Sequence, residues 1–292
     1  MSLMSKLLIS TLVATVTLSA NADNTVGKVA QTVVKKSKIS NKLLLQYLKK
    51  NIIKNPQVSI NDVNVVETKT DKNMPGWDLV MVNMDLTYQK KNLHVPEMMF
   101  IKDGMITSHL VNLETGEDYR ESIKPTVPMA LYNDEHLLFG DKDATHKILI
   151  FSDPQCPFCQ DIIPKIFTAA KKNPKKIALY YYHLPLVAIH PVSDTLTKIM
   201  HLAQVEGKLD VVEKIYSLKI NPREIDMTKI LAAVKAHSGY SVSADKVNDK
   251  KLKKLLELDA MKAADMMVTG TPTIYIDGVW DKDRNGYKKL IK

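Results

Sequence analysis

The sequence predicts an α/β domain with a large helical insertion, preceded by a smaller α+β domain. In the second half, short apolar runs at 148–151 and 177–182 are typical of buried strands, and a helical pattern follows each of them. In the first half, helical spacing up to residue 55 changes to strand-like alternation at 58–66 and 77–88. The expected boundaries are a signal peptide at 1–22, an α+β domain at 23–113, a linker at 114–145 and an α/β domain at 146–292 with its insertion at about 192–267.

The first 22 residues have the three-part layout of a secretory signal peptide. A short basic start is followed by a mostly apolar stretch at 7–20 and by the cleavage signal Ala20-Asn21-Ala22. The apolar stretch is shorter than the ~20 residues that span a bilayer as a helix. We therefore expect an exported, soluble protein that is cleaved after Ala22.

In the α+β domain the predicted elements are helices within 23–55, strands at 58–66 and 77–88, and a β-hairpin. The second helix begins near Ser40 or Asn41 and is ended by Asn55-Pro56, and the hairpin turns at Asp103-Gly104. The linker is polar and expected to be partly helical at 116–123. In the α/β domain we expect a helix after the strand at 148–151, four helices in the insertion, a strand within 270–278, and a terminal helix at about 284–291.

Composition argues for a globular protein and gives no sign of nucleic-acid binding. The chain of 292 residues is 45% apolar and 25% charged, with a net charge of +9. The excess is lysine scattered in pairs rather than arginine in clusters. Because lysines usually stay solvated at the surface, we expect a basic surface and no nucleic-acid partner.

The only two cysteines, Cys156 and Cys159, are separated by two residues. Such a pair can be a structural staple, half of a metal site, or a redox pair. A staple closing so short a loop restricts the unfolded chain little. A structural zinc site needs four ligands, and no second pair of ligands with metal-site spacing is present among His146, His183, His190 and His201. A single close pair of cysteines in an exported chain therefore indicates a redox pair. We expect no metal and no cofactor.

The position of the pair between a strand and a helix predicts different roles for the two thiols. With Cys156 at the helix N-cap and Pro157 at the first helical position, followed by Phe158, free backbone N–H groups would point at the Cys156 sulfur. These groups and the helix dipole favour the thiolate and lower the pKa of Cys156. Cys156 is thus the expected exposed nucleophile, and the more buried Cys159 is expected to resolve the mixed disulfide.

Residues 151–159 resemble the active-site segment of the bacterial periplasmic Dsb thiol:disulfide interchange proteins of the thioredoxin superfamily, especially DsbC and DsbG. Gly270-Thr271-Pro272 resembles their Thr–cis-Pro loop, and Pro164 matches the helix-kinking proline of thioredoxins. The resemblance covers about 147–292, and the first domain shares length and coarse layout with the DsbC/DsbG dimerisation domain. It implies a thioredoxin-like fold, a redox-active Cys156–Cys159 disulfide, and substrate binding by Thr271 and Pro272.

The function implied by this resemblance is that of a periplasmic thiol–disulfide oxidoreductase. Its expected partners are unfolded or misfolded exported proteins, a membrane thiol–disulfide electron partner, and a second copy of the chain in a homodimer. Isomerase or reductase activity is favoured over a DsbA-like oxidase. A dimeric chaperone with secondary redox activity and an exported protein with an inert disulfide are the further alternatives.

In one respect the sequence departs from the thioredoxin pattern. Thioredoxins carry a buried acid six residues before the nucleophile, where this chain has Ile150, so the proton of Cys159 must take another route. Asp153 and Glu135 are candidate aids to that step, although a capping turn explains Asp153 as easily. His183, which follows the strand at 177–182, is a candidate residue of the active face, but a loop or satisfied histidine explains it better.

Overall fold

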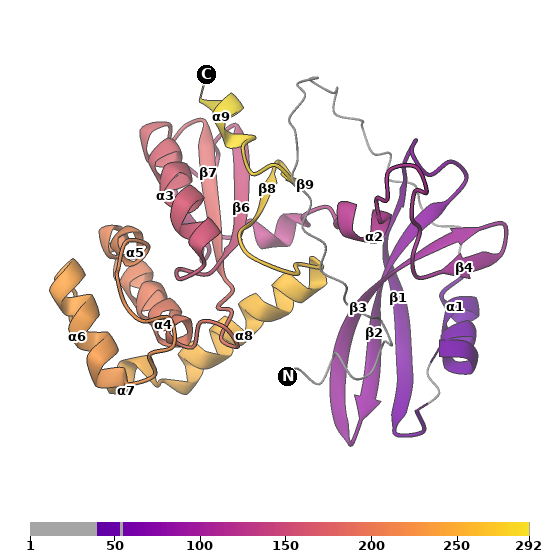
Figure 1. The fold of residues 1–292 in the computed structure, drawn as a ribbon, viewed down its shortest axis with the longest axis horizontal. Coiled ribbons are helices and arrows are strands. Elements are labelled where there is room, and N and C mark those ends of the chain that lie inside the picture. The colour runs from indigo at the N-terminus through magenta and orange to yellow at the C-terminus, as the bar shows by residue number, and fades with distance from the viewer. Residues whose placement is uncertain (1–39, 53–54, 292) are drawn as a thin grey trace.

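The computed structural model describes residues 40–52 and 55–291 and contains two β-sheets, one in each half of the chain (Figure 1). The predicted signal peptide and the helix expected between residues 23 and 39 lie outside the described residues. Among the residues described, no helix has both the length and the apolar character that a membrane span requires.

The first sheet is antiparallel, with the strand order β1-β2-β3-β4. As predicted, a β-hairpin turns at Asp103 and Gly104, whose φ angles of 49° and 80° fit the left-handed turn that Asp-Gly favours. The irregular alternation of the first strand corresponds to register shifts between Ile60 and Asp62 and between Val65 and Glu67. The strands are β1 (Val58–Thr70), β2 (Asp78–Tyr88), β3 (Lys91–Lys102) and β4 (Met105–Thr107).

Both faces of this sheet are covered, which explains why β2 is apolar in both registers. Helix α1 (Asn41–Tyr47) continues into the π-helical turn η2 (Leu48–Ile52), and Leu44 packs with Val80 and Val82 on one face. Leu79 and Phe100 pack on the other face with Tyr119, the first residue of α2 (Tyr119–Ser122). Ser40 occupies the N-cap of α1, but its side chain makes no capping hydrogen bond.

The second sheet has the order β5-β7-β6-β8-β9, with β6 and β7 parallel and the other pairs antiparallel. β5 is a correction to the sequence analysis, which assigned its residues to the linker at 114–145. Leu138 and Phe139 are buried, and the strand pairs with β7. The strands are β5 (Leu137–Phe139), β6 (His146–Ser152), β7 (Ile177–His183), β8 (Thr273–Ile276) and β9 (Val279–Trp280).

Gly140 lets β5 approach the neighbouring strand. Its φ is 84°, and a Cβ atom placed there would lie 1.8 Å from the carbonyl oxygen of Ile177. Only glycine combines this backbone conformation with so close an approach. The chain can therefore turn at this point into the connection that leads to β6.

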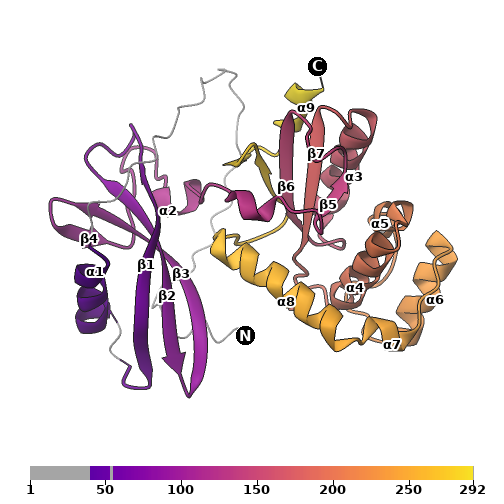
Figure 2. The same ribbon diagram turned by 180° about the vertical axis from the view of Figure 1, so that it is seen from behind.

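Helices cover both faces of the second sheet (Figure 2). Helix α3 and the first helices of the insertion pack on one face, and the C-terminal part of α8 packs on the other. The insertion contains five helices rather than the predicted four, because a short α7 precedes α8. The terminal helix is shorter than predicted, since Arg284 has a positive φ and the helix begins beyond it. The helices are α3 (Pro157–Lys172), α4 (Val192–Val205), α5 (Leu209–Ile215), α6 (Met227–Ser238), α7 (Ala244–Val247), α8 (Lys250–Asp265) and α9 (Tyr287–Leu290); a 3₁₀ turn, η3, spans Met129–Leu131.

The two halves contact each other directly. The Lys69 ammonium donates to the carbonyl oxygen of Lys124 at 2.7 Å, and the Lys124 ammonium donates to that of Met267 at 2.8 Å. His94 of β3 also pairs with Asp265 of α8 at 3.1 Å. Both views show α8 passing beside β3 (Figures 1 and 2). The end of the helical insertion is thus anchored to the first sheet.

Candidate active site

The two cysteines lie where the central strand β6 gives way to helix α3. Cys156 is the N-cap of α3, with an extended backbone (φ −67°, ψ 123°), and Pro157 occupies the first helical position, as the sequence predicts. Proline fits there because its fixed φ suits a helix and its missing N–H has no intrahelical partner to lose. Cys159 follows within the first helical turn, and Pro164 lies inside the helix.

Hydrogen bonds to the Cys156 sulfur stabilise its thiolate. The Cys159 thiol makes the largest contribution, and together with the Thr271 hydroxyl and the backbone N–H groups of Cys159 and Phe158 it outweighs burial and lowers the pKa of Cys156 to about 5. These N–H groups belong to the first turn of α3, whose donors have no partners within the helix. At neutral pH Cys156 is therefore a thiolate, the form that attacks disulfides.

The predicted exposure of Cys156 is wrong, although the predicted order of burial is correct. Cys156 is only 5% exposed and Cys159 is fully buried, whereas Phe158 between them is 68% exposed. The loop containing Thr271 covers Cys156, and the Thr271 carbonyl oxygen lies 3.3 Å from the Cys156 sulfur. Burial also raises the pKa of Cys159, so this residue keeps its proton while Cys156 is ionised. Both cysteines are free thiols in this structure.

Thr271 and Pro272 lie beside the cysteines, although 115 residues separate Thr271 from Cys156 in the chain. The peptide bond between them is cis. The Thr271 hydroxyl is buried and has no hydrogen-bond partner in the structure, so it is free to turn towards the Cys156 sulfur, whose pKa it helps to lower. The sheet creates this juxtaposition, since β8 pairs antiparallel with β6 and Phe151 is opposite Thr273.

Asp153 organises the loops around the cysteines rather than exchanging a proton with them. Its carboxylate is fully buried and accepts four hydrogen bonds. The donors are the backbone N–H of Gln155 at 2.7 Å, the Ser193 hydroxyl at 2.6 Å, the backbone N–H of Leu186 at 2.8 Å and the His190 ring at 3.0 Å. One side chain thus links the active-site loop to residues 184–191 and to the start of α4.

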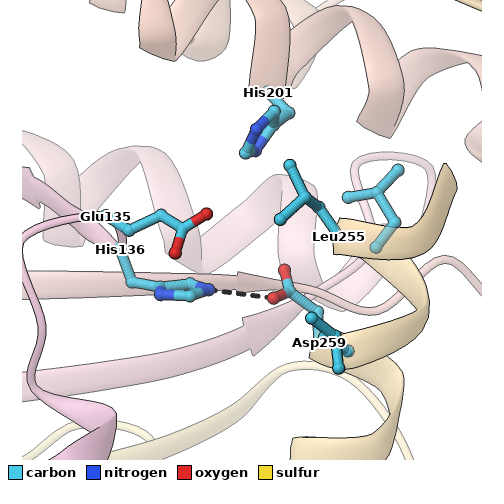
Figure 3. A pocket seen from close by; sticks show the side chains of 7 residues that line it. Glu135, His136, His201, Leu255 and Asp259 are labelled. Atoms are coloured by element: carbon cyan, nitrogen blue, oxygen red, sulfur yellow. Dashed lines mark hydrogen bonds and ion pairs between the residues drawn. The ribbon is translucent and has the colours of Figure 1, made fainter. Parts of the chain in front are cut away.

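Glu135 lines a second site, a pocket of about 40 Å³ between α4, α8 and the segment before β5, together with His136, His201 and Asp259 (Figure 3). His183 does not line the pocket but contacts Asp259 through its backbone. Asp259 accepts from the His136 ring at 2.9 Å and from the backbone N–H of His183 at 2.8 Å. Burial lowers the pKa of His183 to about 3, and neither ring nitrogen has a hydrogen-bond partner. We interpret these contacts as holding α8 against the sheet.

The sequence analysis assigned no role to three residues near Cys159. The hydroxyls of Ser152, Tyr181 and Tyr216 are hydrogen-bonded to one another beside Cys159. Ser152 lies within the segment 151–159 singled out from the sequence, so its position was a signal, whereas the pattern around the two tyrosines indicated only core residues of a strand and a helix. As for metals, residues 40–52 and 55–291 contain no group of three His, Cys, Asp or Glu side chains arranged to hold an ion.

The family model described as Thioredoxin matches residues 132–292, which is more than half of the chain. The chain therefore belongs to the thioredoxin family. The match includes the cysteine pair, the helical insertion and the loop of Thr271 and Pro272, and it begins before β5. A comparison with curated protein sequences gives no match.

Several solved structures are similar to part of the chain. A periplasmic thioredoxin-like protein from Salmonella enterica serovar Typhimurium is 20% identical over 56% of this chain and 91% of its own, with a TM-score of 0.45. BdbD from Bacillus subtilis is 16% identical over 58% of this chain and 97% of its own, with a TM-score of 0.46. ScsC from Proteus mirabilis is 21% identical over 56% of this chain and 76% of its own, with a TM-score of 0.41.

Proposed function

We propose that this protein is a thiol–disulfide oxidoreductase that exchanges disulfides with exported polypeptides. The observation that carries the proposal is the pairing of two chemically different thiols at one helix start. The pKa of Cys156 is lowered to about 5, whereas burial raises that of Cys159. A reactive thiolate beside a protonated, buried thiol is what two-step disulfide exchange requires.

The exchange would proceed through a mixed disulfide. The Cys156 thiolate attacks one sulfur of a substrate disulfide, forms a bond to it, and releases the other substrate sulfur as a thiolate. Cys159 then attacks the Cys156 sulfur, so that the Cys156–Cys159 disulfide forms and the second substrate sulfur leaves with the proton of Cys159. The substrate disulfide is reduced by two electrons and the cysteine pair is oxidised by two.

A polypeptide substrate is supported by the surroundings of the cysteines. Phe158 is 68% exposed, and Val187 and Ile189 in the loop held by Asp153 are 44% and 59% exposed. The Arg284 guanidinium lies 5.7 Å from the centre of the Phe158 ring. Exposed apolar side chains in the cysteine motif and on the loop that Asp153 holds suit unfolded segments, which present apolar groups that a folded protein buries.

For the direction of electron flow we propose isomerase or reductase activity, with electrons supplied by a membrane thiol–disulfide partner. A stabilised thiolate favours the reduced pair, which is the form that attacks incorrect disulfides. The same stabilisation also makes the disulfide form a better oxidant, and this favours the alternative of a disulfide-donating oxidase.

The redox state of the cysteine pair in the cell separates the two directions. Acid quenching followed by a thiol-alkylating mass tag reports how many of the two cysteines are reduced. We expect mostly doubly tagged protein, and a Cys156→Ala, Cys159→Ala double variant provides the untagged control. A mostly untagged wild-type chain would instead establish the oxidase direction and overturn the isomerase proposal.

We further propose that the chain acts as a homodimer through its first sheet. β1 is an edge strand of 13 residues that carries the exposed Val66, and sheet edges offer unpaired N–H and C=O groups to a partner. Light scattering after size exclusion should give a dimer mass for the mature chain. Val66→Lys is expected to weaken the dimer, whereas Val205→Lys on α4 should not, because Val205 is also exposed but lies outside that sheet. A monomeric wild-type protein would contradict this proposal.

A further inference from the structure

Three hydroxyl groups form a buried hydrogen-bonded chain behind the resolving cysteine. The Ser152 oxygen lies 2.7 Å from the Tyr216 oxygen, which lies 2.5 Å from the Tyr181 oxygen. The residues come from three elements: Ser152 ends β6, Tyr181 is in β7, and Tyr216 caps the C-terminus of α5. All three side chains are at most 2% exposed.

The chain leads to the Cys159 sulfur. Burial and then the contact with Cys156 raise the pKa of Cys159, and the Ser152 hydroxyl and the backbone N–H of Asp153 act in the opposite direction, as groups near this sulfur that favour its thiolate. Both tyrosine rings pack against Phe167 of α3, the helix that carries Cys159. The distance between ring centroids is 6.1 Å for Tyr181 and 5.6 Å for Tyr216. The two tyrosines, Phe167 and Cys159 therefore lie in one buried cluster.

The tyrosines remain protonated over the physiological pH range, so they donate hydrogen bonds and do not act as bases. Burial raises the pKa of Tyr181 and the pKa of Tyr216 well above their usual value. Each hydroxyl has one proton, and the chain can direct all three towards the sulfur: Tyr181 donates to Tyr216, Tyr216 donates to Ser152, and Ser152 donates to Cys159. In a site closed to water, such donors stabilise negative charge strongly.

We propose that this hydroxyl chain stabilises the negative charge that develops on the Cys159 sulfur when Cys159 resolves the mixed disulfide. Ser152 would contact the reacting sulfur as a catalytic residue, and Tyr216 and Tyr181 would be positioning residues that act through it. The hydroxyl chain would take the place of a carboxylate six residues before the nucleophile. This protein has Ile150 at that position.

In this step the Cys159 S–H bond breaks and the Cys159–Cys156 disulfide bond forms. The bond between Cys156 and the substrate sulfur breaks, and the departing substrate thiolate takes the proton that Cys159 loses. The three hydroxyls keep their own protons throughout. The proposal rests on the proposed function, because it concerns the second half of the same exchange.

An aromatic disulfide that releases coloured thionitrobenzoate can test the role of the chain, because it reports the two halves of the exchange separately. Attack by Cys156 releases the first equivalent, and attack by Cys159 on the resulting mixed disulfide releases the second. We expect Tyr216→Phe to slow the second phase by about tenfold, the effect of weakening a hydrogen bond to a charged group, and to leave the first phase unchanged. Ser152→Ala should slow the second phase at least as much.

Tyr180→Phe is the matched control, because it removes a hydroxyl from the same strand on the opposite face of the sheet. Its two phases should equal those of the wild type. The first phase also checks folding, because it requires an intact Cys156 site. An unchanged second phase in Tyr216→Phe, or equal slowing of both phases, overturns the hydroxyl chain but leaves the proposed function standing. A wild-type protein that releases no second equivalent would overturn the proposed function as well.

Discussion

Replacing Cys156 with alanine is expected to abolish disulfide exchange. Only Cys156 combines a thiolate at neutral pH with hydrogen bonds from the first turn of α3, whereas the pKa of Cys159 is raised by burial. Reduction of insulin and refolding of a protein with scrambled disulfides should both fall to the uncatalysed rate. Survival of either activity would rule out the thiol mechanism, and suppression of aggregation that persists alone would point to a chaperone.

The pH dependence of alkylation tests the same site without a substrate. The thiolate fraction of Cys156 grows as pH rises through its pKa, so the alkylation rate should be half-maximal near pH 5 and level at neutral pH. Cys159→Ala removes the largest stabilising contact, and the midpoint should then move to higher pH. A wild-type midpoint near 8.5, that of an ordinary thiol, would contradict the description of the site.

Replacing Asp153 with alanine is expected to cause the largest loss of stability among side chains near the site. The substitution leaves four donors without an acceptor in a buried loop, two of them backbone N–H groups. Breaking such a buried polar network typically costs about 3–5 kcal/mol of unfolding free energy. Exchange should also slow, because the loop carrying Val187 and Ile189 loses its attachment to the cysteine loop.

Denaturant unfolding of the reduced protein measures this loss. Asp161→Ala is the control, because Asp161 lies on α3 in an exposed ion pair with Lys165 at 2.7 Å and should be nearly neutral when replaced. Asp153→Asn should lose an intermediate amount of unfolding free energy. Its amide keeps one acceptor oxygen, but its NH₂ group faces partners that are themselves hydrogen-bond donors. Equal stability of Asp153→Ala and Asp161→Ala would refute the role assigned to Asp153.

The chemistry of the cysteine pair was predictable because it depends on neighbours in the chain. Pro157 marks the helix start, and the helix start places Cys156 at free backbone N–H groups, whatever the rest of the fold does. Apolar periodicity similarly predicted most strands and the helical insertion. The short strand β5 was not predictable, because three residues carry no clear period and its pairing with β7 depends on contacts distant in sequence.

By itself, the sequence determined the two halves of the chain, the helix start at Cys156-Pro157-Phe158-Cys159 and the different chemistry of its two thiols. The tertiary structure alone decided what surrounds them. It buries Cys156 under the loop of Thr271, links Asp153 to Leu186, His190 and Ser193, and brings Tyr216 to Ser152 behind Cys159. The physical reason is the distance in sequence over which each interaction acts. Helix capping involves residues within one helical turn. Burial and buried hydrogen bonds join segments that only the packed sheet and its insertion bring together.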